Sequence, residues 1–192
     1  GEILPSVTLA YETWGELDEA GSNAVLILHA LTGDAHVCGE AAPGQPTPGW
    51  WEQIVGPGRI IDTERYYVVA ANVLGGCQGS TGPASLAPDG APWGSRFPVI
   101  STRDQVRAEA LLSDLLGVHT WDIVIGTSLG GHRAIEWAVT YPERVRRLVV
   151  VASGAQTTAD QAAWTHTQIR AIQLDPAWRG GDYYAGPGPN AG

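Results

Sequence analysis

Apolar residues gather along this chain in short blocks separated by polar, glycine-rich segments. The first block alternates apolar and polar positions and is rich in β-forming residues, which is typical of a strand with one solvated face. The later blocks are mainly apolar, and the block at 24–29 is a continuous run typical of a buried parallel strand. Together they predict strands at 7–14, 24–29, 67–72, 121–125 and 145–152.

Three segments repeat apolar residues at helical spacing. Thr102 as N-cap and Gln105 three residues on fit a capping box, which predicts a helix that follows Thr102, buries Ala108, Leu111, Leu112 and Leu115, and ends near Gly117. A second helix follows the strand at 121–125 and stops near Pro142, because proline cannot continue a helix interior. A third is expected at 160–174.

The order of strands and helices predicts an α/β fold with a mostly parallel sheet, right-handed crossovers and flanking helices. Residues 1–155 are interpreted as the N-terminal part of this core, and residues 156–192 as the start of a helical lid region. Gly and Pro accumulate after residue 174, and such a segment does not close a core. The fold is therefore expected to be truncated before the lid and the last strands.

Composition narrows the possible partners. The chain has 11 basic and 20 acidic residues, which argues against nucleic acid. It has no run of 18 apolar residues and no secretory leader pattern, so no membrane association is expected. Cys38 and Cys77 show no metal-binding spacing, and reduced thiols in the cytoplasm are the simpler interpretation. We expect neither a metal nor a bound cofactor.

The most informative stretch is 126–131, which reads Gly-Thr-Ser-Leu-Gly-Gly between a predicted strand and a predicted helix. G-x-S-x-G in this context is the nucleophile elbow of α/β-hydrolase-fold enzymes. The pattern also arises by chance in a chain with 25 glycines, but the flanking strand and helix favour the elbow. Ser128 is therefore the candidate nucleophile for acyl transfer through a covalent serine ester.

Two backbone N–H groups are candidates for the oxyanion hole, the pair of donors that stabilises a tetrahedral intermediate. In this fold one donor belongs to the residue after the nucleophile, here Leu129, and the other to the loop after an early strand. The loop after the strand that ends at His29 stands in the right order, and Leu31 is its candidate. The alternative is an ordinary tight turn beside a buried His29.

A serine nucleophile needs a histidine base and an orienting carboxylate, which follow the serine in this fold. His132 and His166 are the histidines after Ser128. The first lies on the elbow helix and the second on a helix with no strand end nearby, so neither suits a base. The triad Asp and His are expected outside this chain. Cys77 is a further candidate nucleophile, but no strand-to-helix turn surrounds it.

Several motifs together resemble the homoserine O-acetyltransferase family, in order and over nearly the whole chain. They are LAYETWG at 9–15, HALTG at 29–33, NVLGGCQGSTGP at 72–83, FPVISTRD at 97–104, the elbow with AIEW at 134–137, and DP at 175–176 followed by GGDYY at 180–184. The elbow departs from the family in Thr127, Leu129 and His132, where Gly, Met and Met are frequent. None of these changes removes the nucleophile or a backbone donor.

The resemblance implies a cytoplasmic, homodimeric acyltransferase of methionine biosynthesis. Ser128 would take an acetyl or succinyl group from acyl-CoA as co-substrate and pass it to the hydroxyl of L-homoserine by a ping-pong reaction. The family's triad Asp and His and its carboxylate-binding Arg have no matching position here, so these 192 residues alone are expected to be inactive.

Two other functions stay open. A serine carboxylesterase of the same fold would use the same serine and donors with water as acceptor. A non-catalytic binding domain would use neither the serine nor the backbone donors. The sequence also does not separate acetyl from succinyl donors, or homoserine from serine as acceptor.

Overall fold

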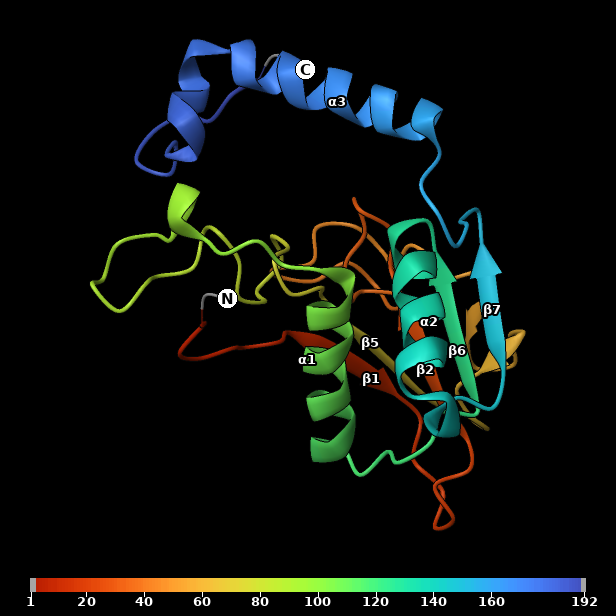
Figure 1. The fold of residues 1–192 in the computed structure, drawn as a ribbon. Helices are drawn as coiled ribbons and strands as arrows, with labels where there is room; N and C mark the ends of the chain where they lie inside the picture. Colours follow the sequence, from red (N-terminus) through yellow and green to blue (C-terminus); the bar gives the residue numbers. More distant parts are fainter. Residues whose placement is uncertain (1–2, 191–192) are drawn as a thin grey trace.

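Residues 3–190, the part of the chain that the computed structural model describes, contain a five-stranded sheet in the order β1–β5–β2–β6–β7 (Figure 1). The strands are β1 (Tyr11–Trp14), β2 (Ala24–Leu28), β5 (Tyr67–Ala71), β6 (Ile123–Thr127) and β7 (Leu148–Val151). Strand β1 pairs antiparallel with β5, and all other neighbours are parallel. The predicted α/β fold with a mostly parallel sheet is confirmed.

The sheet separates the core into two layers. Strand β2 contributes to both, because successive side chains of a strand point to opposite faces. Leu26 and Leu28 belong to a cluster that also holds Trp121 and Trp137, while Val25 and Ile27 belong to a cluster on the other face. The first cluster lies under α1 (Thr102–Leu115) and α2 (Leu129–Thr140), which pack against each other on one side of the sheet (Figure 1).

The second cluster is covered by the segment after β2. This segment includes Val37 and Cys38. It also forms a short pair of parallel strands, β3 (Val55–Gly56) and β4 (Ile61–Asp62), which the sequence did not predict. Strands of two residues carry too little periodicity to be recognised in a sequence. Both faces of the central strands β2 and β5 are therefore covered, as continuous apolar strands require.

The start of α1 differs from the prediction. Ser101, and not Thr102, is the N-cap: its hydroxyl accepts from the Asp104 N–H, and the Asp104 carboxylate accepts from the Ser101 N–H. The capping box lies one residue earlier because the sequence offers two adjacent hydroxyl residues and two adjacent partners three positions on. Gly117 has φ +74° just after the helix, in the left-handed conformation typical of helix ends.

The predicted buried face of α1 is also wrong in part. Leu112 is buried, but Leu111 and Leu115 are 67% and 85% exposed. Glu109 lies on the buried face instead, because a basic partner compensates its charge there. Apolar spacing alone did not show this, since a carboxylate is normally a surface residue.

The segment after β6 forms the predicted helix, which stops near Pro142, and the predicted strand after it. Helix α2 ends before the short 3-10 turn η2 (Pro142–Arg144), and β7 follows. Strand β7 is an edge strand in the described residues, and Leu148, Val149 and Val151 are each about 41–42% exposed.

The C-terminal segment lies beyond the carboxyl ends of β6 and β7 (Figure 1). Helix α3 (Ala159–Leu174) has no buried residue. It leads to η3 (Pro176–Gly181), and the following Asp182 accepts hydrogen bonds from the N–H and hydroxyl of Ser95 in η1 (Gly94–Arg96). The division of the chain at residue 155 stays a prediction.

None of the helices in residues 3–190 has the length and apolar character needed to cross a membrane.

Candidate active site

Ser128 lies at the turn between the end of β6 and the start of α2, with φ 51° and ψ −115°. A positive φ is unfavourable for a residue with a Cβ, so this backbone is strained, as the elbow hypothesis expects. Neighbouring backbone fixes it: the Ser128 N–H donates to the Val151 carbonyl at 3.0 Å, and its carbonyl accepts from the Gly131 N–H at 2.9 Å. Ser128 is exposed, and its side chain makes no capping bond to the helix.

Close packing explains the glycines on both sides of the serine. A Cβ on Gly126 would lie 2.0 Å from the Gly130 carbonyl oxygen. A Cβ on Gly130 would lie 1.9 Å from the Leu28 carbonyl oxygen. Both distances are impossible for real atoms, so the turn forms only where these positions lack side chains.

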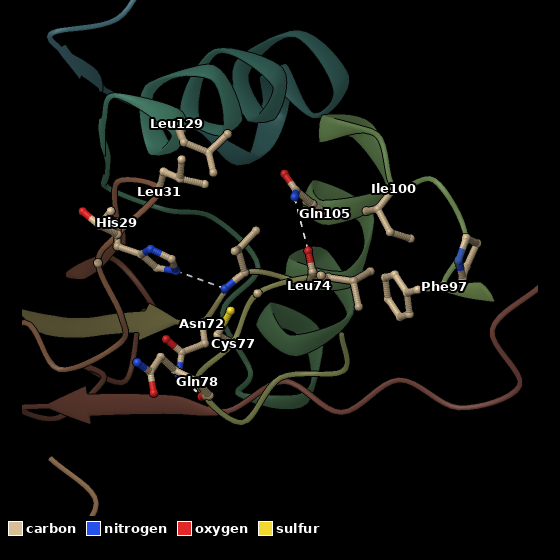
Figure 2. Close-up of a pocket in the computed structure, with 16 residues that line it drawn as sticks. His29, Leu31, Asn72, Leu74, Cys77, Gln78, Phe97, Ile100, Gln105 and Leu129 are labelled. Atoms are coloured by element: carbon tan, nitrogen blue, oxygen red, sulfur yellow. Dashed lines mark hydrogen bonds between the residues drawn. The ribbon is translucent and has the colours of Figure 1, made fainter. Parts of the chain in front are cut away.

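The two candidate oxyanion donors border the same pocket. Leu129 is the first residue of α2, and Leu31 lies in the loop after β2; Figure 2 shows both at one end of the pocket. Within the described residues, neither N–H has a hydrogen-bond acceptor. Two free N–H groups at one pocket end, one of them at a helix N-terminus, suit a developing negative charge.

The pocket has a volume of about 580 Å³ and lies between the loop after β2, the loop after β5 and the start of α1. Ser128 is not one of its lining residues but directly precedes Leu129 at its border. The wall is formed largely by apolar side chains and glycine backbone: Leu31, Val73, Leu74, Gly75, Gly76, Phe97, Pro98, Ile100 and Leu129. Gln105 adds a polar group, since its amide nitrogen donates to the Leu74 carbonyl at 3.2 Å while its Oε1 is buried without a partner (Figure 2).

His29 is a buried, neutral histidine. Its Nε2 accepts from the Val73 N–H at 3.0 Å, so Nδ1 carries the proton and donates to the Ala30 carbonyl at 2.7 Å. Burial, and secondarily the charge of Arg133, lower the pKa of His29 to about 4. With both ring nitrogens engaged, His29 shapes the loop and is not free to act as a base for Ser128.

The other candidates are two histidines and two cysteines in different parts of the fold. His132 follows Ser128 on α2, and its backbone N–H donates to the Ser128 carbonyl at 3.3 Å. His132 lines a separate pocket of about 460 Å³ with Glu136 and Ala155, and His166 is exposed on α3. Cys77 is exposed in the loop after β5 and lines the main pocket, with no strand-to-helix turn around it. Cys38 is buried, which raises the pKa of its thiol to about 11.

A buried ionic group beneath the elbow was missed by sequence reasoning. Arg133 of α2 is fully buried; its Nη1 donates to Glu109 of α1 at 2.5 Å and its Nη2 to the His29 carbonyl at 2.9 Å. The other Glu109 oxygen accepts from the Trp137 indole N–H at 2.8 Å. The available signal was an arginine one turn after Leu129 on an otherwise apolar helix face.

The mostly parallel sheet and the strained serine turn are typical of the α/β-hydrolase fold. The family model for the alpha/beta hydrolase fold matches residues 23–192, and the chain belongs to this family. Among its members, the chain is similar to homoserine O-acetyltransferases: it is 65% identical to that of Thermobifida fusca over 98% of this chain, and 54% identical to that of Mycobacterium tuberculosis over 100%. The resemblance noted in the motifs is thereby confirmed.

Solved structures of homoserine O-acetyltransferases and esterases are also similar to this chain. Homoserine O-acetyltransferase from Bacillus anthracis is 34% identical with a TM-score of 0.86, and esterase E22 is 38% identical with a TM-score of 0.85. Each comparison covers 92% of this chain and 50% of the other. The chain likewise spans about half the length of the curated relatives it matches, 50% for T. fusca and 51% for M. tuberculosis.

Proposed function

We propose that the full-length protein transfers an acetyl group from acetyl-CoA to the hydroxyl of L-homoserine through an acyl-Ser128 intermediate. The observation that carries this proposal is the strained, exposed Ser128 between β6 and α2, next to two unpaired N–H groups. The names of the 54–65% identical relatives support the acetyl donor and the homoserine acceptor. Succinyl-CoA as donor and L-serine as acceptor are tested by using each in place of acetyl-CoA or L-homoserine in the assay below.

In the first half-reaction, the Ser128 Oγ attacks the thioester carbonyl carbon and its proton passes to a base. The carbonyl oxygen becomes an oxyanion that the N–H groups of Leu31 and Leu129 stabilise. The C–S bond then breaks and CoA leaves as the thiol with the proton. In the second half-reaction, the homoserine hydroxyl attacks the ester carbonyl carbon and gives its proton to the base. The bond between that carbon and the Ser128 Oγ then breaks, the base returns the proton to the Oγ, and O-acetylhomoserine leaves.

The triad Asp and His, and the arginine that would bind the homoserine carboxylate, are proposed to lie in the rest of the full-length protein. Residues 1–192 alone are then inactive. We also propose that the enzyme works in the cytoplasm as a homodimer, on the strength of the family resemblance. No bound cofactor or metal takes part in this scheme, and acyl-CoA is a co-substrate.

A serine esterase of the same fold is the second candidate, and the similarity to esterase E22 supports it. Both functions share the acyl-serine and differ in the acceptor. The test measures CoA release from acetyl-CoA by the full-length protein, with and without L-homoserine. The proposal expects release that rises with homoserine, together with O-acetylhomoserine. Release that is indifferent to homoserine and yields acetate would assign the esterase function.

Ser128→Ala should lower either activity by roughly 10⁴-fold or more, because the covalent route is removed. Thr127→Ser changes the adjacent side chain without touching the nucleophile and is the matched control. Unchanged turnover in Ser128→Ala would reject both enzymatic functions.

A further inference from the structure

The loop that carries Leu31 is held from below by the elbow helix. The guanidinium of Arg133 donates from Nη2 to the His29 carbonyl, two residues before Leu31. Its Nη1 donates to Glu109, so α1, α2 and this loop meet at one buried cation. Arg133 is 0% exposed and Glu109 3%, which excludes solvent screening of the pair.

The next carbonyl of the loop is fixed as well. The Ala30 oxygen accepts from His29 Nδ1–H at 2.7 Å and from the Gly33 N–H at 3.0 Å. In a trans peptide the C=O and N–H point in opposite directions. Two bonds to the Ala30 carbonyl therefore direct the Leu31 N–H away from the loop interior, and they also polarise that N–H.

We propose that Arg133, with its charge balanced by Glu109, is a positioning residue for the oxyanion hole. This inference rests on the proposed oxyanion role of Leu31. Leu129 begins α2, and Arg133 lies one turn further along the same helix, so a single helix sets the positions of both donors. The guanidinium holds the His29 carbonyl, and this fixes the spacing between the Leu31 and Leu129 N–H groups.

A purely structural role makes a different prediction. Replacing both members of a buried ion pair with neutral side chains of similar volume often leaves stability unchanged. If the pair served stability alone, such a double variant would keep both its fold and its activity. If Arg133 positions the loop, the fold survives and the transition state loses stabilisation.

The main test is the double variant Glu109→Gln/Arg133→Met in the full-length protein. The amide oxygen introduced by Glu109→Gln still accepts from the Trp137 indole, while the His29 carbonyl loses its donor. We expect the thermal unfolding midpoint to stay close to wild type and kcat to fall about 10- to 100-fold, with KM for acetyl-CoA little changed.

A second measurement reports on the oxyanion hole directly. A boronic acid that adds to Ser128 places an oxygen between the two donors, so its affinity should fall by about the same factor as kcat/KM. Arg147→Met is the matched control, because Arg147 pairs with Asp122 at 2.9 Å just before β6, at the opposite end of that strand from Ser128. Its kcat and boronate affinity should equal those of wild type.

If the double variant does not fold, Arg133→Lys replaces it. The lysine ammonium does not reproduce the planar guanidinium that bridges Glu109 and the His29 carbonyl. We therefore expect kcat to fall again while KM for acetyl-CoA is unchanged. Wild-type kcat and boronate affinity in a folded variant would overturn the inference. The proposed function would still stand in that case if Ser128→Ala remained inactive, so the two failures are distinguishable.

Discussion

At the residue scale, the backbone of Ser128 is held in an unfavourable conformation by its neighbours. The strain is offset by packing that only glycine permits, at Gly126 and Gly130. His29 adds a second constraint, because its neutral ring is built into the loop beside the pocket. The site therefore depends on contacts that do not touch substrate, and two substitutions test this.

Gly130→Ala places a methyl group against the Leu28 carbonyl, where the distance would be 1.9 Å. The backbone must shift, and we expect a loss of about 2–4 kcal/mol in the free energy of unfolding, together with loss of activity. Denaturant unfolding measures the change. Gly154→Ala is the control, since the nearest atom to its Cβ would be 3.8 Å away. Equal stability of the two variants would contradict the packing argument.

The pKa of His29 predicts a pH dependence of stability. It is about 4 in the folded protein against an ordinary value of 6.5. Between these values the unfolded chain binds a proton that the folded chain does not, so stability is full above about pH 6.5 and falls as the pH drops toward 4. The contribution of His29 is at most about 3 kcal/mol.

Unfolding measured from pH 7 to pH 4.5 should therefore show a slope that His29→Asn reduces. His119→Asn, at an exposed histidine, should leave the slope as in wild type. An unchanged slope in His29→Asn would show that the ring titrates normally in the folded protein.

At the element scale, the sequence predicted the strands and helices that carry the site, because each has a strong pattern. Strand β2 and strand β6 are continuous apolar runs, and α2 has small residues on the face that packs on the sheet. The errors fall where two local signals compete, as at the start of α1, where the cap is Ser101.

Ser101→Ala should lower the free energy of unfolding by about 1 kcal/mol, because the Asp104 N–H and the capping box are lost. Thr102→Ala, one residue inside the helix, should change it by less than half of that. A larger effect at Thr102 than at Ser101 would show that Thr102 is the N-cap, as the sequence predicts.

The buried face of α1 shows why part of the site escaped prediction. Glu109 is buried only because Arg133 and Trp137, distant in sequence, meet it in the fold. Such a partnership depends on the tertiary arrangement of α1 and α2, and no local spacing encodes it. The serine and both oxyanion candidates were predicted because their positions follow from local motifs at the ends of two strands.

At the scale of the whole molecule, the described residues form the part of the α/β-hydrolase fold that carries Ser128. Strand β7 and helix α3 expose apolar side chains, including Val149, Trp164 and Ile169. We propose that the acid and base that the reaction requires come from the rest of the full-length protein. The chemistry of Ser128 is therefore tested when those groups are present.

The most direct measurement mixes the full-length protein with acetyl-CoA in the absence of homoserine, quenches within the first turnover, and determines the mass of each peptide. The account predicts one acetyl group on the peptide that contains Ser128, released as O-acetylhomoserine when homoserine is added. An acetyl group on another residue, or turnover with no covalent adduct and full activity in Ser128→Ala, would contradict it.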